Sequence, residues 1–118
     1  MFAIGAWDNV NKELYLSRDR FGIKPLYYNI NETGFYFASE IKTLLETEIA
    51  KPKINNSSLK ELLNYQYSLD KTTIIHGVQR LLPGETIILK EGKIEKSIKN
   101  NLYDSLEKKN KSEKEYLD

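Results

Sequence analysis

A short charged run, Arg18-Asp19-Arg20, lies between two apolar segments and is the first candidate for chemistry. Guanidinium groups hold carboxylates through paired N–H donors, so this run could clamp a substrate carboxylate. Charged groups next to buried strands are also costly to leave unpaired, and Asp19 already supplies a counter-charge. We therefore favour an ion-pair knot that holds a loop at the sheet edge, and keep the clamp as the alternative.

Other residue types that support catalysis are scarce in this sequence. It contains no cysteine, which excludes a thiolate nucleophile, a disulfide and a thiolate metal site. Its one histidine, His76, precedes Gly77 and is expected in a loop, with nothing nearby to form a triad or metal cluster. No glycine-rich phosphate loop is present. The residues therefore predict no catalytic, substrate-binding or metal-ligating site in this chain.

The composition limits the classes of partner. The chain has 118 residues, enough for one modest domain, and 18 Lys and Arg against 17 Asp and Glu. The resulting net charge of +1 does not suggest a nucleic-acid or membrane-surface partner. No apolar run approaches the roughly 20 residues that span a bilayer, and the first residues lack a secretory leader. We expect a cytoplasmic protein.

The elements that would position these residues are mostly strands in the first half. Two hairpins are expected, with turns at 8–11 and 31–34 and strands at 2–7, 14–16, 26–30 and 35–38. The run 2–7 is nearly continuously apolar, which predicts a strand buried on both faces. Pro25 fixes its own φ and favours an extended conformation at Lys24.

Helices are expected in the middle of the chain. Ser39 could cap a helix that runs from Glu40 to about Glu46, with Glu40 in its first turn. The run 55–58 (Asn-Asn-Ser-Ser) should start a second helix, which continues to about Tyr67. The dipeptide Pro-Gly at 83–84 then predicts a turn before a further hairpin over 86–95. The expected class is α+β, with antiparallel strands and two to three helices.

Four segments together resemble one known family. Residues 18–28 (Arg-Asp-Arg-Phe-Gly-Ile-Lys-Pro-Leu-Tyr-Tyr) are similar, almost letter for letter, to part of the glutaminase domain of B-type asparagine synthetases. Residues 1–8, 37–44 and 73–84 resemble, in the same order, other segments of that domain. The resemblance extends over residues 1 to about 95.

This resemblance implies an incomplete N-terminal-nucleophile fold, an αββα sandwich of class II glutamine amidotransferases. The family's nucleophile is a cysteine exposed as the first residue, and it and the glutamine-binding residues precede the matched segments. No catalytic residue is therefore transferred to this chain. The matched positions that we expect to be structural marks of the scaffold are Arg18, Asp19, Gly22, Pro25, Ser39 and Glu40.

The resemblance also sets expectations for organisation and partners. Residues 1–96 would be the C-terminal half of the glutaminase domain, and 97–118 a charged linker with the start of a truncated synthetase domain. Ser112 could cap a helix there. The parent enzyme would amidate aspartate with ATP, Mg and glutamine-derived ammonia, whereas this chain would hold no cofactor and be inactive alone.

Partners would be the missing upstream glutaminase half and the downstream synthetase domain, with homo-oligomers possible through exposed sheet edges. Two alternatives stay open. The chain could be a non-catalytic half-domain that complements a separate subunit, or a fragment of a related amidotransferase acting on a sugar or peptide.

Overall fold

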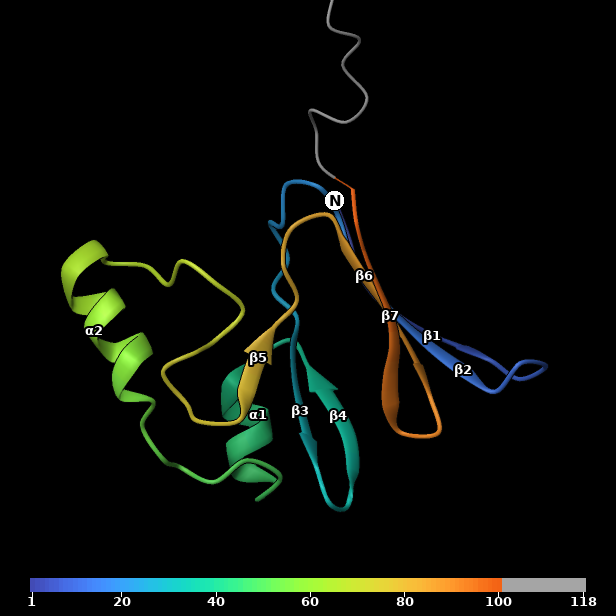
Figure 1. Cartoon of the computed structure of the whole chain (residues 1–118), viewed down its shortest axis with the longest axis horizontal. Coiled ribbons are helices and arrows are strands. Elements are labelled where there is room, and N and C mark those ends of the chain that lie inside the picture. The colour runs from blue at the N-terminus through green and yellow to red at the C-terminus, as the bar shows by residue number, and fades with distance from the viewer. Residues whose placement is uncertain (101–118) are drawn as a thin grey trace, which may run out of the picture.

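Two antiparallel sheets form the body of the molecule in a computed structural model that describes residues 1–100 (Figure 1). The first sheet has the strand order β1-β2-β6-β7, and the second β4-β3-β5. The strands of the first sheet are β1 (Ala3–Asp8), β2 (Glu13–Arg18), β6 (Glu85–Lys90) and β7 (Lys93–Lys99). Those of the second are β3 (Tyr27–Asn31), β4 (Gly34–Ala38) and β5 (Val78–Arg80). With helices α1 (Ile41–Glu46) and α2 (Asn56–Tyr65), the α+β class is confirmed.

Local turn chemistry forms the three expected hairpins. Asp8 Oδ1 accepts the Val10 and Asn11 N–H groups, which closes the β1–β2 turn. Asn31 Oδ1 accepts the Thr33 N–H at the β3–β4 turn. Glu91 and Gly92 join β6 to β7, both with positive φ. Asx turns of this kind let the side chain supply a hydrogen bond that the reversing backbone needs.

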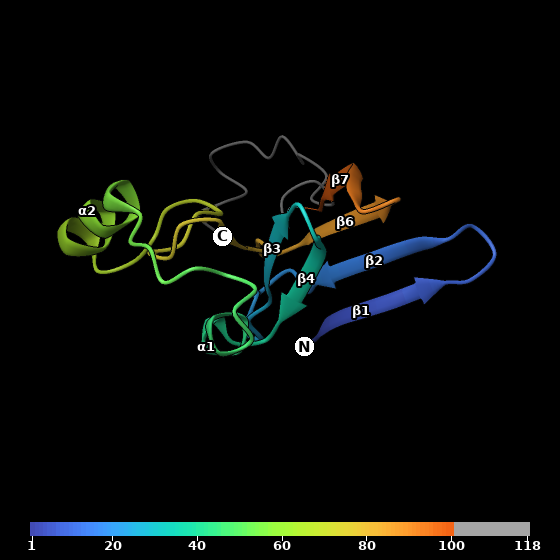
Figure 2. The same cartoon turned by 90° about the horizontal axis from the view of Figure 1, so that it is seen from below.

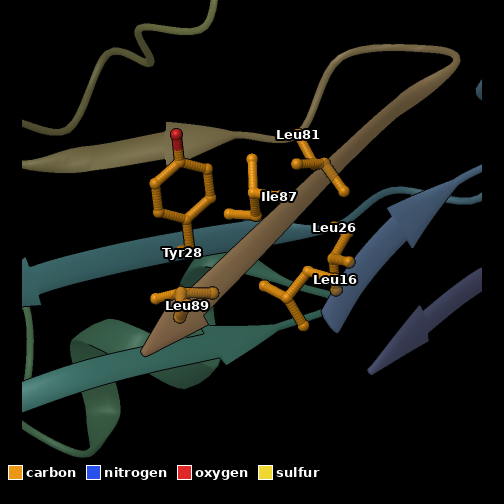
Figure 3. Packing of buried hydrophobic residues seen from close by; sticks show 6 residues of the cluster. All are labelled: Leu16, Leu26, Tyr28, Leu81, Ile87 and Leu89. Atoms are coloured by element: carbon orange, nitrogen blue, oxygen red, sulfur yellow. The ribbon is translucent and has the colours of Figure 1, made fainter. Parts of the chain in front are cut away.

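The main hydrophobic core lies between the two sheets (Figure 3). Leu16 of β2 stands opposite Ile87 of β6, and both side chains are fully buried. Tyr28 of β3 faces them from the second sheet, and its ring stacks on Phe35 of β4 with centroids 5.6 Å apart. The buried members of this core are Leu16, Leu26, Tyr28, Leu81, Ile87 and Leu89. Alternation along β2, β3 and β6 places the strand residues of this core on the inner faces, whereas Leu26 and Leu81 directly adjoin β3 and β5.

Strand β1 contradicts the expectation of burial on both faces. Ile4 is 48% exposed and Trp7 59% exposed. The reason is position, because among residues 1–100 β1 is an edge strand that pairs only with β2. The second sheet approaches β1 at Gly5, where a Cβ would lie 2.7 Å from Cε2 of Phe37. An apolar run therefore indicates a strand here, but not the number of layers that cover it.

Helix α1 completes a second, smaller core. Leu44 is buried and packs with Ala50 and Val78, while Ile41 and Leu45 lie against them. The predicted Ser39 cap is wrong. Glu40 occupies the N-cap position with an extended backbone, no side chain caps the helix, and no acidic residue lies in its first turn.

Helix α2 stands at the side of the molecule, away from both sheets (Figures 1 and 2). The Asn55 side chain caps it by accepting the Ser57 and Ser58 N–H groups, which confirms the expected start. The helix ends at Tyr65, earlier than expected, because Gln66 adopts the left-handed conformation with φ 62°. Neither helix in residues 1–100 has the length and apolar character to cross a membrane.

Candidate functional site

Asp19 ties together three parts of the chain at the end of β2. Its Oδ2 accepts the Phe2 N–H at 2.8 Å, and its Oδ1 accepts the N–H groups of Phe21 and Gly22 at 2.9 and 3.0 Å. Its own carbonyl accepts the Gly84 N–H at 2.9 Å. The side chain is nearly inaccessible, with 6% exposed. Asp19 therefore positions backbone around it and has few acceptor sites left for a ligand.

The side chain of Arg18 also binds backbone groups, in this case three carbonyls. Its Nε donates to the Lys24 carbonyl at 2.7 Å, Nη1 to the Leu81 carbonyl at 2.6 Å, and Nη2 to the Gly22 carbonyl. No ion pair joins it to Asp19 within residues 1–100. The favoured ion-pair knot is thus corrected: the loop is held, but by hydrogen bonds to backbone.

Side-chain alternation explains this correction. Neighbouring residues in extended backbone point to opposite sides, so Arg18 and Asp19 reach different backbone groups. The clamp alternative also loses its main donor, because three carbonyls already take N–H groups of Arg18. Arg20 is exposed and belongs to neither hydrogen-bonded set.

Two glycines allow the loop to close. Gly22 has φ 61°, and a Cβ there would lie 2.6 Å from Cγ of Pro83. Gly84 has φ 71°, and a Cβ there would lie 2.3 Å from the carbonyl oxygen of Asn100. An L side chain would be strained at both positions and would collide with its neighbours. Gly22 was expected as a scaffold mark, whereas Gly84 was seen only as a turn residue.

The expected scaffold marks border two adjoining hollows. Arg18 and Asp19 line a cavity of about 320 Å³ at the start of β6. Pro25, Ser39 and Glu40 line a second cavity of about 520 Å³. Met1 and Phe2 line both cavities, so the structure brings five of the six marks around the residues that precede β1. Gly22, the sixth, packs against Pro83 at the base of the loop.

The electrostatics of this loop favour the charged form of Asp19. The hydrogen bond from the Phe2 N–H is the largest cause of the lowered pKa of Asp19. Burial opposes it, and smaller contributions from the Phe21 and Gly22 N–H groups act in the same direction as Phe2. Burial lowers the pKa of Arg18. Asp19 is therefore ionised at neutral pH and can accept these backbone donors fully.

A buried carboxylate was missed by the sequence reasoning. Glu85, 1% exposed, forms an ion pair with Lys71 and accepts the Ser97 hydroxyl at 2.8 Å and the Leu82 N–H at 2.9 Å. Its burial could have been predicted from the sequence, because Glu85 alternates with Ile87 and Leu89 on the buried face of β6. Lys71, in contrast, could be found only in three dimensions.

The same region holds a buried phenol. Tyr28 donates its hydroxyl to Oε1 of Gln79 at 2.6 Å. Burial raises the pKa of Tyr28 to about 12, with further contributions from the negative charges of Glu85 and Asp70. At neutral pH Tyr28 is therefore a neutral donor with a structural use.

The remaining candidate residue lies where it was expected. His76 is exposed in a loop before Gly77, and its backbone N–H donates to the Lys53 carbonyl at 2.7 Å. Residues 1–100 contain no group of three or more His, Cys, Asp or Glu side chains that could hold a metal ion. What this region can do chemically is hold backbone in place, through Arg18, Asp19 and Glu85.

The described residues form two antiparallel sheets that are held together by the hydrogen-bonded loop at Asp19. The family described as glutamine amidotransferase domain matches residues 1–102, and the chain belongs to it. The match confirms the resemblance to the glutaminase domain of asparagine synthetases.

Several characterised or named relatives are similar to this chain. Asparagine synthetase [glutamine-hydrolyzing] 1 of Bacillus subtilis (strain 168) is 28% identical over 127 residues, covering 90% of this chain and 20% of the relative. A putative asparagine synthetase [glutamine-hydrolyzing] of Mycobacterium tuberculosis (strain ATCC 25618 / H37Rv) is 39% identical over 87 residues, covering 71% of this chain and 13% of the relative. Amidase chry2 of Gibberella zeae is 34% identical over 87 residues, covering 74% and 12%. The chain thus spans a fifth or less of these relatives.

Proposed function

We propose that this chain is a scaffold segment of a glutamine-hydrolysing asparagine synthetase, whose whole reaction is ATP-dependent amidation of aspartate with ammonia from glutamine. One observation carries the proposal: the loop at residues 18–28, on which the resemblance rests, is held by Arg18 and Asp19 through backbone hydrogen bonds. Those bonds join the residues before β1 to the starts of β3 and β6.

The segment contributes structure, and glutamine hydrolysis itself requires residues supplied by another polypeptide segment. The chain has no cysteine to form a thioester, and the polar groups of Arg18 and Asp19 are engaged by backbone. ATP and Mg belong to the synthetase part of the proposed parent. The proposed compartment is the cytoplasm.

The test is complementation of the purified chain. The second component is a polypeptide that carries the first part of the Bacillus subtilis glutaminase domain, ending before the strand equivalent to β1. We expect glutamate release from glutamine only when both components are mixed, and none when the first cysteine of the added polypeptide is replaced by Ala. Turnover by the chain alone, above a blank and without the added polypeptide, would overturn the proposal.

A second candidate is a non-catalytic half-domain that completes a separate subunit. The observation that favours it is the set of outer strands β1, β7 and β4, each of which pairs on one side only among residues 1–100. Open strand edges recruit another strand readily. Binding of the added polypeptide without glutamate release would favour this candidate.

The acceptor is a separate question, because one relative bears the name amidase rather than asparagine synthetase. A related amidotransferase that acts on a sugar or peptide is the corresponding alternative. Substitution of aspartate by other acceptors in an assay of the complete enzyme distinguishes these cases by which acceptor becomes amidated.

A further inference from the structure

A further hollow lies beside the second sheet, and none of its lining residues belongs to the loop at Asp19. It encloses about 760 Å³ and is lined by three separate stretches, at residues 29–36, 47–53 and 76–77. Ligand pockets typically measure about 300–1,000 Å³. We call this hollow the basic groove. Neither the fold core nor the proposed scaffold role uses it.

One wall of the basic groove is a connected row of polar side chains. Asn29, only 6% exposed, donates to the Gly77 carbonyl at 2.8 Å and accepts from Asn31 at 3.2 Å. Asn31 also donates to the Ile49 carbonyl at 3.1 Å, and its Oδ1 accepts the Thr33 hydroxyl at 2.6 Å. These bonds fix the wall to both opposing stretches, so the groove is formed before any ligand binds.

The charged residues of the lining lie on the stretch 47–53, where Lys51 and Lys53 accompany a single carboxylate, Glu48. His76 lies on the third stretch of the lining. Backbone bonds from Lys53 to Lys51, at 2.7 Å, and from His76 to Lys53, at 2.7 Å, hold these three residues together. Neither lysine forms an ion pair within residues 1–100. The groove therefore combines an excess of positive charge with a rigid polar wall.

We propose that the basic groove binds a small phosphate-bearing molecule, with the ammonium groups of Lys51 and Lys53 contacting the phosphate oxygens. A carboxylate ligand is usually held by the paired donors of a guanidinium, and no arginine lines this groove. Lysine ammonium groups act as point charges with three donors each, which suits a multiply charged phosphate group. The row from Asn29 to Thr33 would face the uncharged part of the ligand.

The test is titration of the full chain with inorganic phosphate and, in parallel, with adenosine monophosphate, followed by amide chemical shifts. We expect saturable shifts confined to residues 29–33, 47–53 and 76–77. The double variant Lys51→Gln, Lys53→Gln should weaken binding by about tenfold or more. The matched control Lys60→Gln, Lys93→Gln makes the same charge change on α2 and β7 and should leave binding unchanged.

Folding of all variants is compared by circular dichroism, and both lysines of the test pair are exposed, so their replacement should not unfold the chain. Equal weakening in the control pair would overturn the proposal, because attraction would then follow net charge. Equivalent chemical-shift changes with sodium chloride at matched ionic strength would also overturn the proposal. So would the absence of saturable shifts when either probe is titrated to concentrations above about 1 mM.

Discussion

At the scale of single residues, Asp19 shows how a motif that invites a ligand hypothesis can be occupied by backbone. Three N–H groups, from Phe2, Phe21 and Gly22, approach its carboxylate. An amide in its place would keep one acceptor oxygen and introduce an NH₂ group facing donors. Asp19→Asn should therefore lower the melting temperature at neutral pH.

The sign of the pH dependence follows from the lowered pKa of Asp19. Its contribution to stability is present above the unfolded value of 3.8 and is lost as pH falls through the lower folded value. The melting-temperature difference between wild type and Asp19→Asn, measured by circular dichroism, should thus shrink as pH falls below about 4. A difference that is constant from pH 7 to pH 3 would contradict this account of Asp19.

Arg18 makes a separate prediction, because its three carbonyl partners require the forked geometry of a guanidinium. Lysine keeps the charge but can serve only part of this set. Arg18→Lys should lower the free energy of unfolding by about 1–3 kcal/mol in a urea titration. Arg20→Lys is the matched control, since Arg20 is exposed, and it should change stability little. Equal effects of the two changes would mean that the carbonyl contacts of Arg18 are unimportant.

At the scale of elements, the ion pair between Lys71 and Glu85 fastens the segment after α2 to the start of β6. The side chain of Glu85 is 2% exposed, so loss of its counter-charge is costly. Lys71→Met should lower the free energy of unfolding by about 3–5 kcal/mol. Adding Glu85→Gln should restore much of this loss, because a neutral amide needs no counter-charge.

The exposed ion pair between Lys42 and Glu46 provides the control for the Lys71 and Glu85 substitutions. Their side chains are 75% and 66% exposed, so Lys42→Met should cost less than about 1 kcal/mol. Thermal or urea unfolding of the four Lys71 and Glu85 combinations measures the coupling between the two residues. Additive effects of the two changes would contradict the buried pair as the source of stability.

Elements also show what the sequence could and could not predict. The hairpins were predictable because their turns rest on local chemistry, such as Asp8 accepting from Val10 and Asn11. The Asn55 cap was predictable for the same reason. The exposure of β1 and the pairing of β2 with β6 depend on contacts distant in sequence, so local patterns did not contain them. The helix at Ile41 begins without a side-chain cap, which left its start open to a wrong prediction at Ser39.

The candidate site follows the same division. Residues 18–28 were recognised as structural from their motif, but the backbone partners of Arg18 lie as far along the chain as Leu81. Lys71 and Glu85 were invisible as a pair, because only folding brings them together. Local motifs thus located the loop, and only the fold revealed how its polar groups are used.

At the scale of the whole molecule, strands β1, β7 and β4 each leave one edge unpaired within residues 1–100. Strand β1 has one neighbour, β2, and carries the exposed apolar side chains of Ile4 and Trp7. Natural edge strands that avoid association commonly carry charged residues, and β1 has only Asp8 at its end. We therefore expect the chain to associate through β1, either with the further polypeptide of the proposed parent enzyme or with a second copy.

A lysine near the start of this edge strand should suppress that association. Ile4→Lys places a charge on β1 at an exposed position and should shift the sedimentation profile towards monomer at concentrations where the wild type associates. Val10→Lys is the matched control, because Val10 is 88% exposed in the turn beyond the strand and should leave association unchanged. A wild-type chain that stays monomeric throughout would refute association through β1. Equal effects of both lysines would instead assign the change to net charge, because only Ile4 lies on the edge where a new strand would pair.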